Sequence, residues 1–248
     1  MIILADIHTH TLLSGHAFSS LLENARCARE NGLAIMASTD HGPRMPGANP
    51  AFFHFANLQV VPEVVDGVRV LKGIEANVLD DEGSLDVPDW ILAGLDLVLA
   101  GLHDVCISQA GREENTTRLI RLMERGYVDV ITHPGNPYFP IDGERVVEAA
   151  VRHGVLLELN NSSLRGGVRP GSRENCLELA RWMNQAGIPA VLGSDAHWCG
   201  DVGRLDKALE LALAAGFSPE NILNLNPGRL EEFVAQRKAR RAETFESR

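Results

Sequence analysis

Seven short apolar runs, separated by longer stretches of mixed apolar and polar residues, recur along the 248-residue chain. Each run is continuous and rich in valine, isoleucine or leucine. This is typical of parallel strands that are covered on both faces. The runs lie at residues 2–10, 34–41, 68–76, 95–103, 128–133, 155–161 and 190–197. The pattern therefore predicts seven strands of one parallel sheet.

The stretches between the runs have the spacing of amphipathic helices. Ser20 with Glu23 three residues later forms a capping-box pattern, and Asp142 and Ser172 are suited to begin two further helices. A glycine precedes six of the seven runs, Gly67 among them, and indicates where a helix ends. Strand and helix thus alternate, with connections long enough for right-handed crossovers. An open doubly wound sheet and a closed barrel both fit this α/β pattern.

The domain organisation follows from the absence of any break in composition. We predict a single barrel domain over residues 1–235. Residues 236–248, "QRKARRAETFESR", have little apolar content, so we predict a frayed or disordered charged tail there.

Composition narrows the possible environment and partners. No apolar run is long enough to span a bilayer, and the chain enters its first strand without a signal-peptide pattern, so we expect a cytoplasmic protein without a membrane partner. The formal charge of −10 argues against a nucleic-acid surface. None of the four cysteines forms a C-x-x-C pair, so we expect reduced thiols. A homo-oligomer remains open.

Histidines gather at the ends of the apolar runs. Six of the nine lie there and His16 lies just beyond one, which leaves only His54 and His153 elsewhere. The carboxyl ends of barrel strands meet at one face, where active sites lie. His8 and His10 are two residues apart on one strand, so both side chains point to the same face and can bind one ion. His16 must return from the following loop.

The candidate metal ligands are imidazoles and carboxylates, which suit zinc, manganese or iron. They number nine, and one zinc site takes about four. If Glu75 bridges two ions, the set provides about ten of the roughly twelve bonds that three ions need. Asp6 and Asp40 either orient a ligand histidine or are ordinary buried aspartates. The nine candidates are His8, His10, His16, His41, Glu75, His103, His133, Asp195 and His197.

These residues resemble the PHP family, named for polymerase and histidinol phosphatase. The resemblance rests on "DIHTH", His16, "TDHG", "GIEAN", "AGLHD", "THPGNP" and "GSDAH", and it covers essentially the whole chain. The phrases "DHGP", "HPGNP" and "NNSS" resemble the YcdX-like phosphatase branch more narrowly. The resemblance implies a distorted seven-stranded TIM-like barrel and a trinuclear metal centre. It also implies the grouping of the ligands: His8, His10, Glu75 and Asp195; Glu75, His103 and His133; His16, His41 and His197.

The function that the resemblance implies is hydrolysis of a small phosphomonoester by a metal-bridging hydroxide. Three divalent ions would serve, zinc foremost, with manganese or iron as the other candidates. Glu75, Asp195 and His197 are the residues that we assign to catalysis as well as to metal binding. Arginine binds phosphate in a bidentate manner. The candidate substrate-binding residues are therefore Arg44, Arg165, Arg169 and Arg204.

Other functions remain open from the sequence. A PHP-type nuclease or phosphodiesterase has the same ligands, although the acidic chain lacks a basic patch. A metal-dependent amidohydrolase also begins with H-x-H, but many bridge their metals with a modified lysine at the end of strand four. None of Lys72, Lys207 and Lys238 ends a fourth strand. A barrel that keeps metals only for stability or partner binding is the third alternative.

Overall fold

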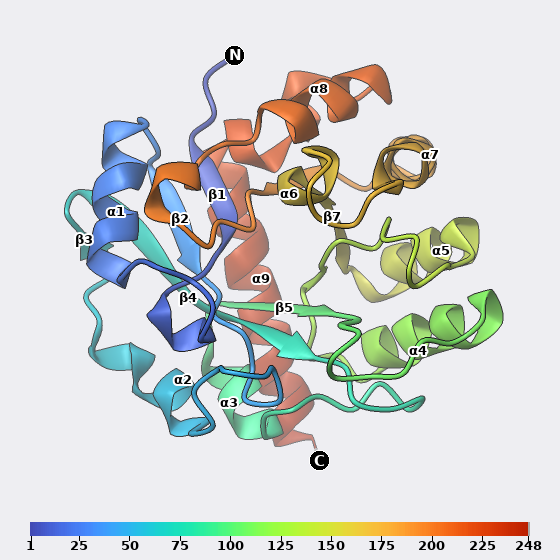
Figure 1. Cartoon of the computed structure of the whole chain (residues 1–248), viewed down its shortest axis with the longest axis horizontal. Helices are drawn as coiled ribbons and strands as arrows, with labels where there is room; N and C mark the ends of the chain where they lie inside the picture. The colour runs from blue at the N-terminus through green and yellow to red at the C-terminus, as the bar shows by residue number, and fades with distance from the viewer. Residues whose placement is uncertain (248) are drawn as a thin grey trace.

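The computed structural model describes residues 1–247, and its centre is a parallel sheet that curls into a barrel (Figure 1). Seven strands follow one another in the order β1-β2-β4-β5-β6-β7-β8, and each pair of neighbours is parallel. The strands are β1 (Ala5–Thr9), β2 (Ile35–Ser38), β4 (Val68–Asn77), β5 (Leu97–Gly101), β6 (Val130–Ile131), β7 (Leu156–Asn160) and β8 (Val191–Gly193).

The first and last strands meet and nearly close the barrel. The amide N of His10 donates to the carbonyl of Ala196 at 2.9 Å, and the amide N of Asp195 donates to the carbonyl of His8 at 2.9 Å. Thr9 and Ala196 form an isolated parallel bridge. The predicted seven-stranded α/β barrel is therefore confirmed, and the open sheet is excluded.

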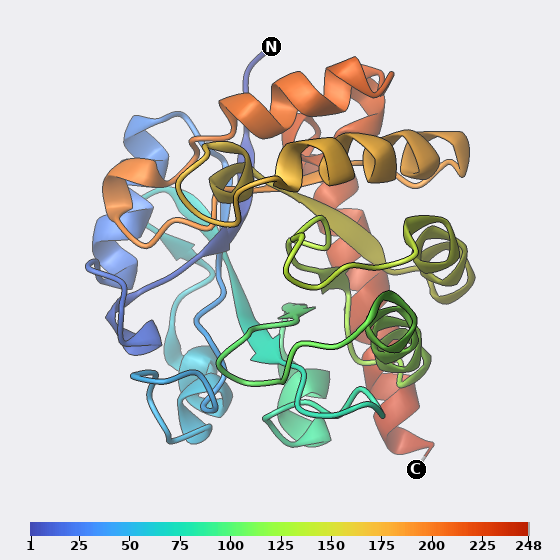
Figure 2. The same ribbon diagram turned by 45° about the vertical axis from the view of Figure 1, so that its right-hand side comes forward.

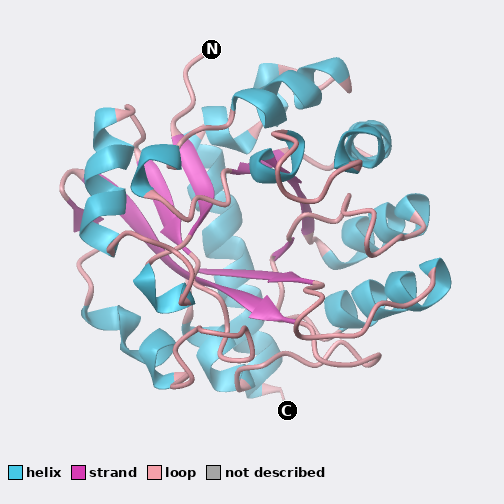
Figure 3. Cartoon of the chain, viewed as in Figure 1, coloured by secondary structure: helices cyan, strands magenta, loops and turns pink. Residues whose placement is uncertain are grey.

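Helices surround the barrel (Figure 3). The apolar side chains of the strands pack against them, and every residue of β1, β5 and β7 is buried. Among the described residues, no helix has both the length and the apolar character needed to cross a membrane. The helices are α1 (Leu21–Glu30), α2 (Phe53–Asn57), α3 (Asp89–Gly94), α4 (Arg112–Glu124), α5 (Gly143–His153), α6 (Asn161–Leu164), α7 (Ser172–Gln185), α8 (Asp206–Ala214) and α9 (Pro227–Glu246).

Two of the predicted helix starts are confirmed. The Ser20 side chain accepts from the amide of Glu23, and the Glu23 carboxylate accepts from the amide of Ser20, which completes a capping box for α1. The Asp142 carboxylate accepts from the amide three residues later and caps α5. These starts depend on local hydrogen bonds alone, so the sequence is sufficient to locate them.

Two local predictions are wrong. Ser172 is the first residue of α7 rather than its cap; the cap position belongs to Gly171, whose φ of 88° favours glycine. Gly67 does not end a helix. It lies with Asp66 in the turn that joins a short antiparallel strand, β3 (Val64–Val65), to β4, and both turn residues have positive φ.

The predicted disordered tail is also wrong over residues 236–246, because these residues form the second half of α9; residue 248 of that tail lies outside the described residues. Figures 1 and 2 show α9 passing behind the barrel strands. Arg237 and Arg241 are buried there, and both donate to the carboxylate of Asp129, the residue before β6. The low apolar content was misleading because these arginines are held by a buried tertiary partner rather than by an apolar face.

Candidate metal centre

The ends of the strands bring all nine predicted ligand side chains to one mouth of the barrel. His16 and His197 form its solvent side, while the other seven residues are buried. Parallel strands produce this arrangement because their carboxyl ends point the same way. The ligands come from β1, from β4, and from the segments after β1, β2, β5, β6 and β8.

Glu75, on β4, lies at the centre of the cluster. Its Oε1 lies 3.0 Å from His133 Nε2 and 3.2 Å from His103 Nε2. Its Oε2 lies 2.8 Å from His41 Nδ1 and 3.3 Å from His8 Nε2. Each carboxylate oxygen therefore faces imidazole nitrogens from different strands.

Asp195 closes the cluster on the β8 side. Its Oδ1 lies 3.3 Å from His10 Nε2 and 3.7 Å from His8 Nε2, and these two imidazole nitrogens are 3.0 Å apart. Asp195 and His133 both have positive φ, 56° and 35° respectively. Non-glycine residues in this region cost on the order of 1–3 kcal/mol, and such strain gathers at functional sites.

The solvent side of the cluster consists of stacked imidazoles. His16 Nε2 lies 3.0 Å from His197 Nε2, and the ring of His16 stacks on that of His41 with centroids 5.1 Å apart. His197 Nδ1 lies 3.0 Å from the carbonyl oxygen of Asp195, which can only accept a hydrogen bond. The proton of neutral His197 therefore lies on Nδ1, and its Nε2 lone pair faces His16.

Two supporting residues were missed from the sequence. Glu158 Oε1 lies 2.7 Å from His8 Nδ1, and its Oε2 accepts from the amide of His133 at 2.8 Å. Asn77 Oδ1 lies 2.7 Å from His103 Nδ1. These contacts fix each ring so that Nε2 points into the cluster, as is usual for histidines that bind metals. The i, i+2 spacing of Glu158 and Asn160 at a strand end was the available signal.

The alternatives left open for two aspartates are resolved by their contacts. Asp40 Oδ1 accepts from the Ser14 hydroxyl at 2.7 Å, and the Ser14 oxygen lies 3.0 Å from His10 Nδ1. Asp40 therefore orients His10 through a serine. Asp6 accepts from three backbone amides along the seam between β1 and β8. Its role is to hold the seam rather than an imidazole.

The pKa values follow from burial and from the neighbouring charges. Burial raises the pKa of Glu75, but surrounding imidazoles outweigh this and hold it well below its usual value. Burial lowers the pKa of His10 well below normal, and burial with the nearby Arg169 lowers the pKa of His133 to about 4. Burial would lower the pKa of His8, yet three carboxylates raise it well above normal. At neutral pH, His10 and His133 are therefore neutral, as metal binding requires.

One of the four predicted substrate-binding arginines reaches the cluster. Arg169 Nη1 donates to Asp195 Oδ2 at 3.1 Å and to the Ser163 hydroxyl at 3.2 Å. Its other guanidinium nitrogens have no partner among residues 1–247. Arg169 is therefore placed to contact a ligand at the mouth while it stays anchored to Asp195.

The other three arginines lie on the exposed surface. Arg165 and Arg204 both donate to Asp201 Oδ1, at 2.9 and 2.7 Å. The side chain of Arg44 is exposed and pairs with no carboxylate of the described chain. The structure thus separates Arg169 from the remaining candidates.

The donor set fits divalent metal ions. Glu75 Oε2 and His41 Nδ1 are buried and 2.8 Å apart, yet neither has a hydrogen-bond partner among residues 1–247. Two buried polar atoms in this state require another ligand, because an unpaired one costs about 1–3 kcal/mol. The donor atoms form three groups, and within each group all atoms lie within 4.8 Å of one another. The groups are His8, His10 and Glu75; His41, Glu75 and His103; His10, His41 and His197.

A seven-stranded barrel with this cluster at its mouth fits a metal-dependent hydrolase. No family model matches the chain. It is 46% identical over 239 residues to a probable phosphatase of Thermoanaerobacter sp. strain X514, covering 96% of this chain and 97% of that one. It is also 46% identical over 235 residues to a probable phosphatase of Acetivibrio thermocellus, covering 95% and 96%. The chain therefore belongs to this family of phosphatases.

The fold is similar to that of a solved histidinol phosphate phosphatase from Lactococcus lactis, which is complexed with zinc, L-histidinol and phosphate. The TM-score is 0.61, and the match covers 88% of this chain and 95% of that one. The sequence identity is 16%, so this comparison shows the fold alone. The curated relatives support a phosphatase, and the histidine–carboxylate cluster supplies donor atoms that fit divalent metal.

Proposed function

We propose that the protein is a PHP phosphatase of the YcdX-like branch, which hydrolyses a small phosphomonoester with three divalent ions, zinc foremost. The observation that carries this proposal is the position of Glu75. Its two oxygens lie within 3.6 Å of imidazole nitrogens from five histidines. A single carboxylate among so many donors is suited to bridge ions rather than to complete one four-ligand site.

The division of ligands among the ions follows the resemblance, and the distances support one histidine pair in each group. Glu75 joins the first two groups, whose histidine pairs have nitrogens 3.0 and 3.3 Å apart. The third group is held together by the 3.0 Å contact between two nitrogens on its solvent side. The groups are His8, His10, Glu75 and Asp195; Glu75, His103 and His133; His16, His41 and His197.

Each part of the site has a task in this reaction. Bound divalent ions supply positive charge that binds phosphate oxygens and lowers the pKa of a water molecule enough for attack on phosphorus. The free guanidinium nitrogens of Arg169 donate to a phosphate oxygen, while Asp195 fixes the position of that arginine. Glu158 and Asn77 hold imidazoles in the orientation that points Nε2 inward.

A small monoester suits this site better than a nucleic acid. Affinity for nucleic acid comes largely from lysine and arginine that neutralise phosphates. The chain has 33 acidic against 23 basic residues, and only three of the basic residues are lysines. A terminal phosphate dianion also offers more free oxygens to three ions than a diester does.

Elemental analysis and a substrate comparison test the proposal. Protein purified without chelator and reconstituted with zinc or manganese should contain about three ions per chain. It should hydrolyse phenyl phosphate with a higher kcat/KM than a phosphodiester or single-stranded DNA. At most one ion per chain would contradict the trinuclear centre, and a preference for either diester substrate would make the protein a nuclease or phosphodiesterase.

A further inference from the structure

We propose that a cleft beside the metal centre holds the alcohol part of the substrate, and that Asp104 makes this cleft reject alcohols with a second anionic group. This inference rests on the proposed phosphatase function. We call the cavity the leaving-group cleft. It is lined by His103 and Arg169 next to the centre and by Asp104, Gln109, Tyr138 and Val168 further out.

The position of the cleft connects it to the reacting phosphate. His103 Nε2 lies 3.2 Å from Glu75 Oε1, and Arg169 Nη1 lies 3.1 Å from Asp195 Oδ2. His103 therefore belongs both to the wall of the cleft and to the metal cluster, and Arg169 connects the wall to Asp195 of the cluster. The cavity volume is about 610 Å³, which is within the range of small-molecule sites. A phosphate bound at the cluster would direct its ester group into this space.

The cleft is preformed by hydrogen bonds between its loops. Gln109 Nε2, in the segment after β5, donates to the carbonyl of Tyr138 at 3.2 Å. The amide of Tyr138 donates to Asn136 Oδ1 at 3.1 Å. The side chains of Tyr138 and Val168 are 45% and 50% exposed, and they provide aromatic and aliphatic surface. A leaving group with a ring can therefore cover them, and burial of this apolar area favours its binding.

The charges of the cleft define what it excludes. Among the described residues, Arg169 is the only arginine or lysine in its wall, and Asp195 already pairs with it. Asp104 has an exposed carboxylate, and no residue of the described chain forms a hydrogen bond or ion pair with it. A carboxylate or second phosphate on the leaving group would meet Asp104 without a compensating cation. A hydroxyl or ammonium group could instead donate to it.

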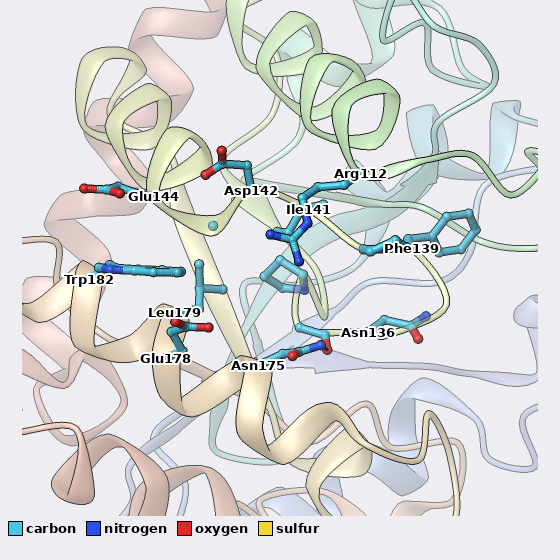
Figure 4. Close-up of a pocket in the computed structure, with 14 residues that line it drawn as sticks. Arg112, Asn136, Phe139, Ile141, Asp142, Glu144, Asn175, Glu178, Leu179 and Trp182 are labelled. Atoms are coloured by element: carbon cyan, nitrogen blue, oxygen red, sulfur yellow. Dashed lines mark hydrogen bonds between the residues drawn. The ribbon is translucent and has the colours of Figure 1, made fainter.

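A neighbouring cavity provides a control. It has a volume of about 340 Å³ and lies on the other side of the turn at residues 134–139, whose Asn136 lines both spaces. Figure 4 shows Glu178 and Trp182 on α7, with Glu144 opposite them. Among the described residues that line this cavity, none is one of the nine candidate ligands. The turn that follows His133 forms part of its wall. Glu178 is thus an exposed carboxylate near the cleft but outside its wall.

The test compares phenyl phosphate with 4-carboxyphenyl phosphate, which adds one carboxylate to the same ring. Wild-type holoenzyme should have a kcat/KM about 10-fold higher for phenyl phosphate. Asp104→Asn should reduce this ratio to about 2 by improving turnover of the carboxylated ester. Glu178→Gln should leave the ratio unchanged. The ratio is the readout because any effect on the metal centre acts on both esters alike.

The outcomes separate this inference from the function on which it rests. If wild-type enzyme hydrolyses both esters equally well, or if Asp104→Asn keeps the wild-type ratio, the inference is overturned and the phosphatase function stands. An equal change of the ratio in Glu178→Gln would overturn it too, because a general charge effect would then suffice. If the metal-loaded enzyme hydrolyses neither ester, the proposed function itself fails. Asp104→Ser provides a second variant if Asp104→Asn does not fold.

Discussion

The two ends of the barrel both bury charged side chains, but they differ in whether the chain provides hydrogen-bond partners for them. At the base, Asp129 accepts from Arg237 at 3.0 Å, from Arg241, and from the amide of Val98 at 2.8 Å. At the mouth, the fully buried Glu75 has an oxygen, Oε2, without a hydrogen-bond partner in the described part of the chain. The chain itself satisfies the buried charge at the base. The mouth instead leaves a buried oxygen that a bound metal ion would satisfy.

This difference separates stability from function within one barrel. A buried charge whose partners are removed costs about 3–5 kcal/mol, so the base contributes to folding as a complete network. The mouth also contains strained backbone at His133 and Asp195, which a purely structural cluster would not need. Substitutions at the base should therefore change stability, and substitutions at the mouth should change metal content and turnover.

The largest expected effect comes from Glu75→Gln. This change preserves the shape of the side chain but removes the charge that faces five imidazoles. We expect loss of metal and a fall in kcat of about 10⁴-fold, because groups that act as a unit fail together. Elemental analysis and a phosphomonoester assay measure both, with circular dichroism to show that the fold is retained. Full metal occupancy with a normal rate would mean that Glu75 does not bridge.

The next effect is expected at the base, from Arg241→Met. The side chain of Arg241 is fully buried and shares Asp129 with Arg237, so its removal leaves the carboxylate poorly compensated. We expect a loss of about 3–5 kcal/mol in the free energy of unfolding, with unchanged metal content per folded chain. Urea denaturation followed by circular dichroism measures this change.

A matched control for that substitution lies next to it on α9. Arg240 is exposed and donates to the carbonyl of His153 at 2.9 Å. Arg240→Met should therefore cost less than about 1 kcal/mol. Equal stability of the Arg241→Met and Arg240→Met variants would show that the buried network does not hold α9 in place.

The smallest expected effect is a pH dependence of the metal-free protein. The pKa of His133 is about 4 in the fold, against an ordinary value of 6.5. The unfolded chain therefore takes up this proton first, and stability should fall as the pH falls from 6.5 to about 4. One pKa unit corresponds to about 1.4 kcal/mol, so the share of His133 in this loss should reach about 3 kcal/mol. Burial lowers the pKa of His10 too, so His10 adds to this loss, whereas His8, whose pKa is raised, opposes it near pH 6.5.

Urea unfolding of chelator-treated protein at pH 7 and pH 4.5 measures this dependence. The His133→Asn variant should lose less stability than wild type between the two pH values, because it lacks the group that takes up the proton. An identical loss in both proteins would show that other residues, and not His133, cause the pH dependence.

Much of the fold could be predicted because its determinants are local. Continuous Val-, Ile- and Leu-rich runs located the seven strands, and Ser20 and Asp142 located two helix starts. The positions of the histidines at the ends of the runs also indicated one shared mouth, since parallel strands bring their carboxyl ends together. Closure of the barrel between β1 and β8 was implied only by the family resemblance, because residues 9 and 196 are remote in sequence.

The sequence by itself thus determined the strands, their common direction and the chemistry of the mouth. Only the tertiary structure decided which polar residues support that chemistry. Glu158 reaches His8 across 150 positions, and Arg241 reaches Asp129 across 112. Such pairs leave no periodic signal, because each depends on one contact between distant strands or helices. Hydrophobic periodicity reports whether a segment can be buried, whereas the partner of a buried charge is fixed only when the chain has closed around it.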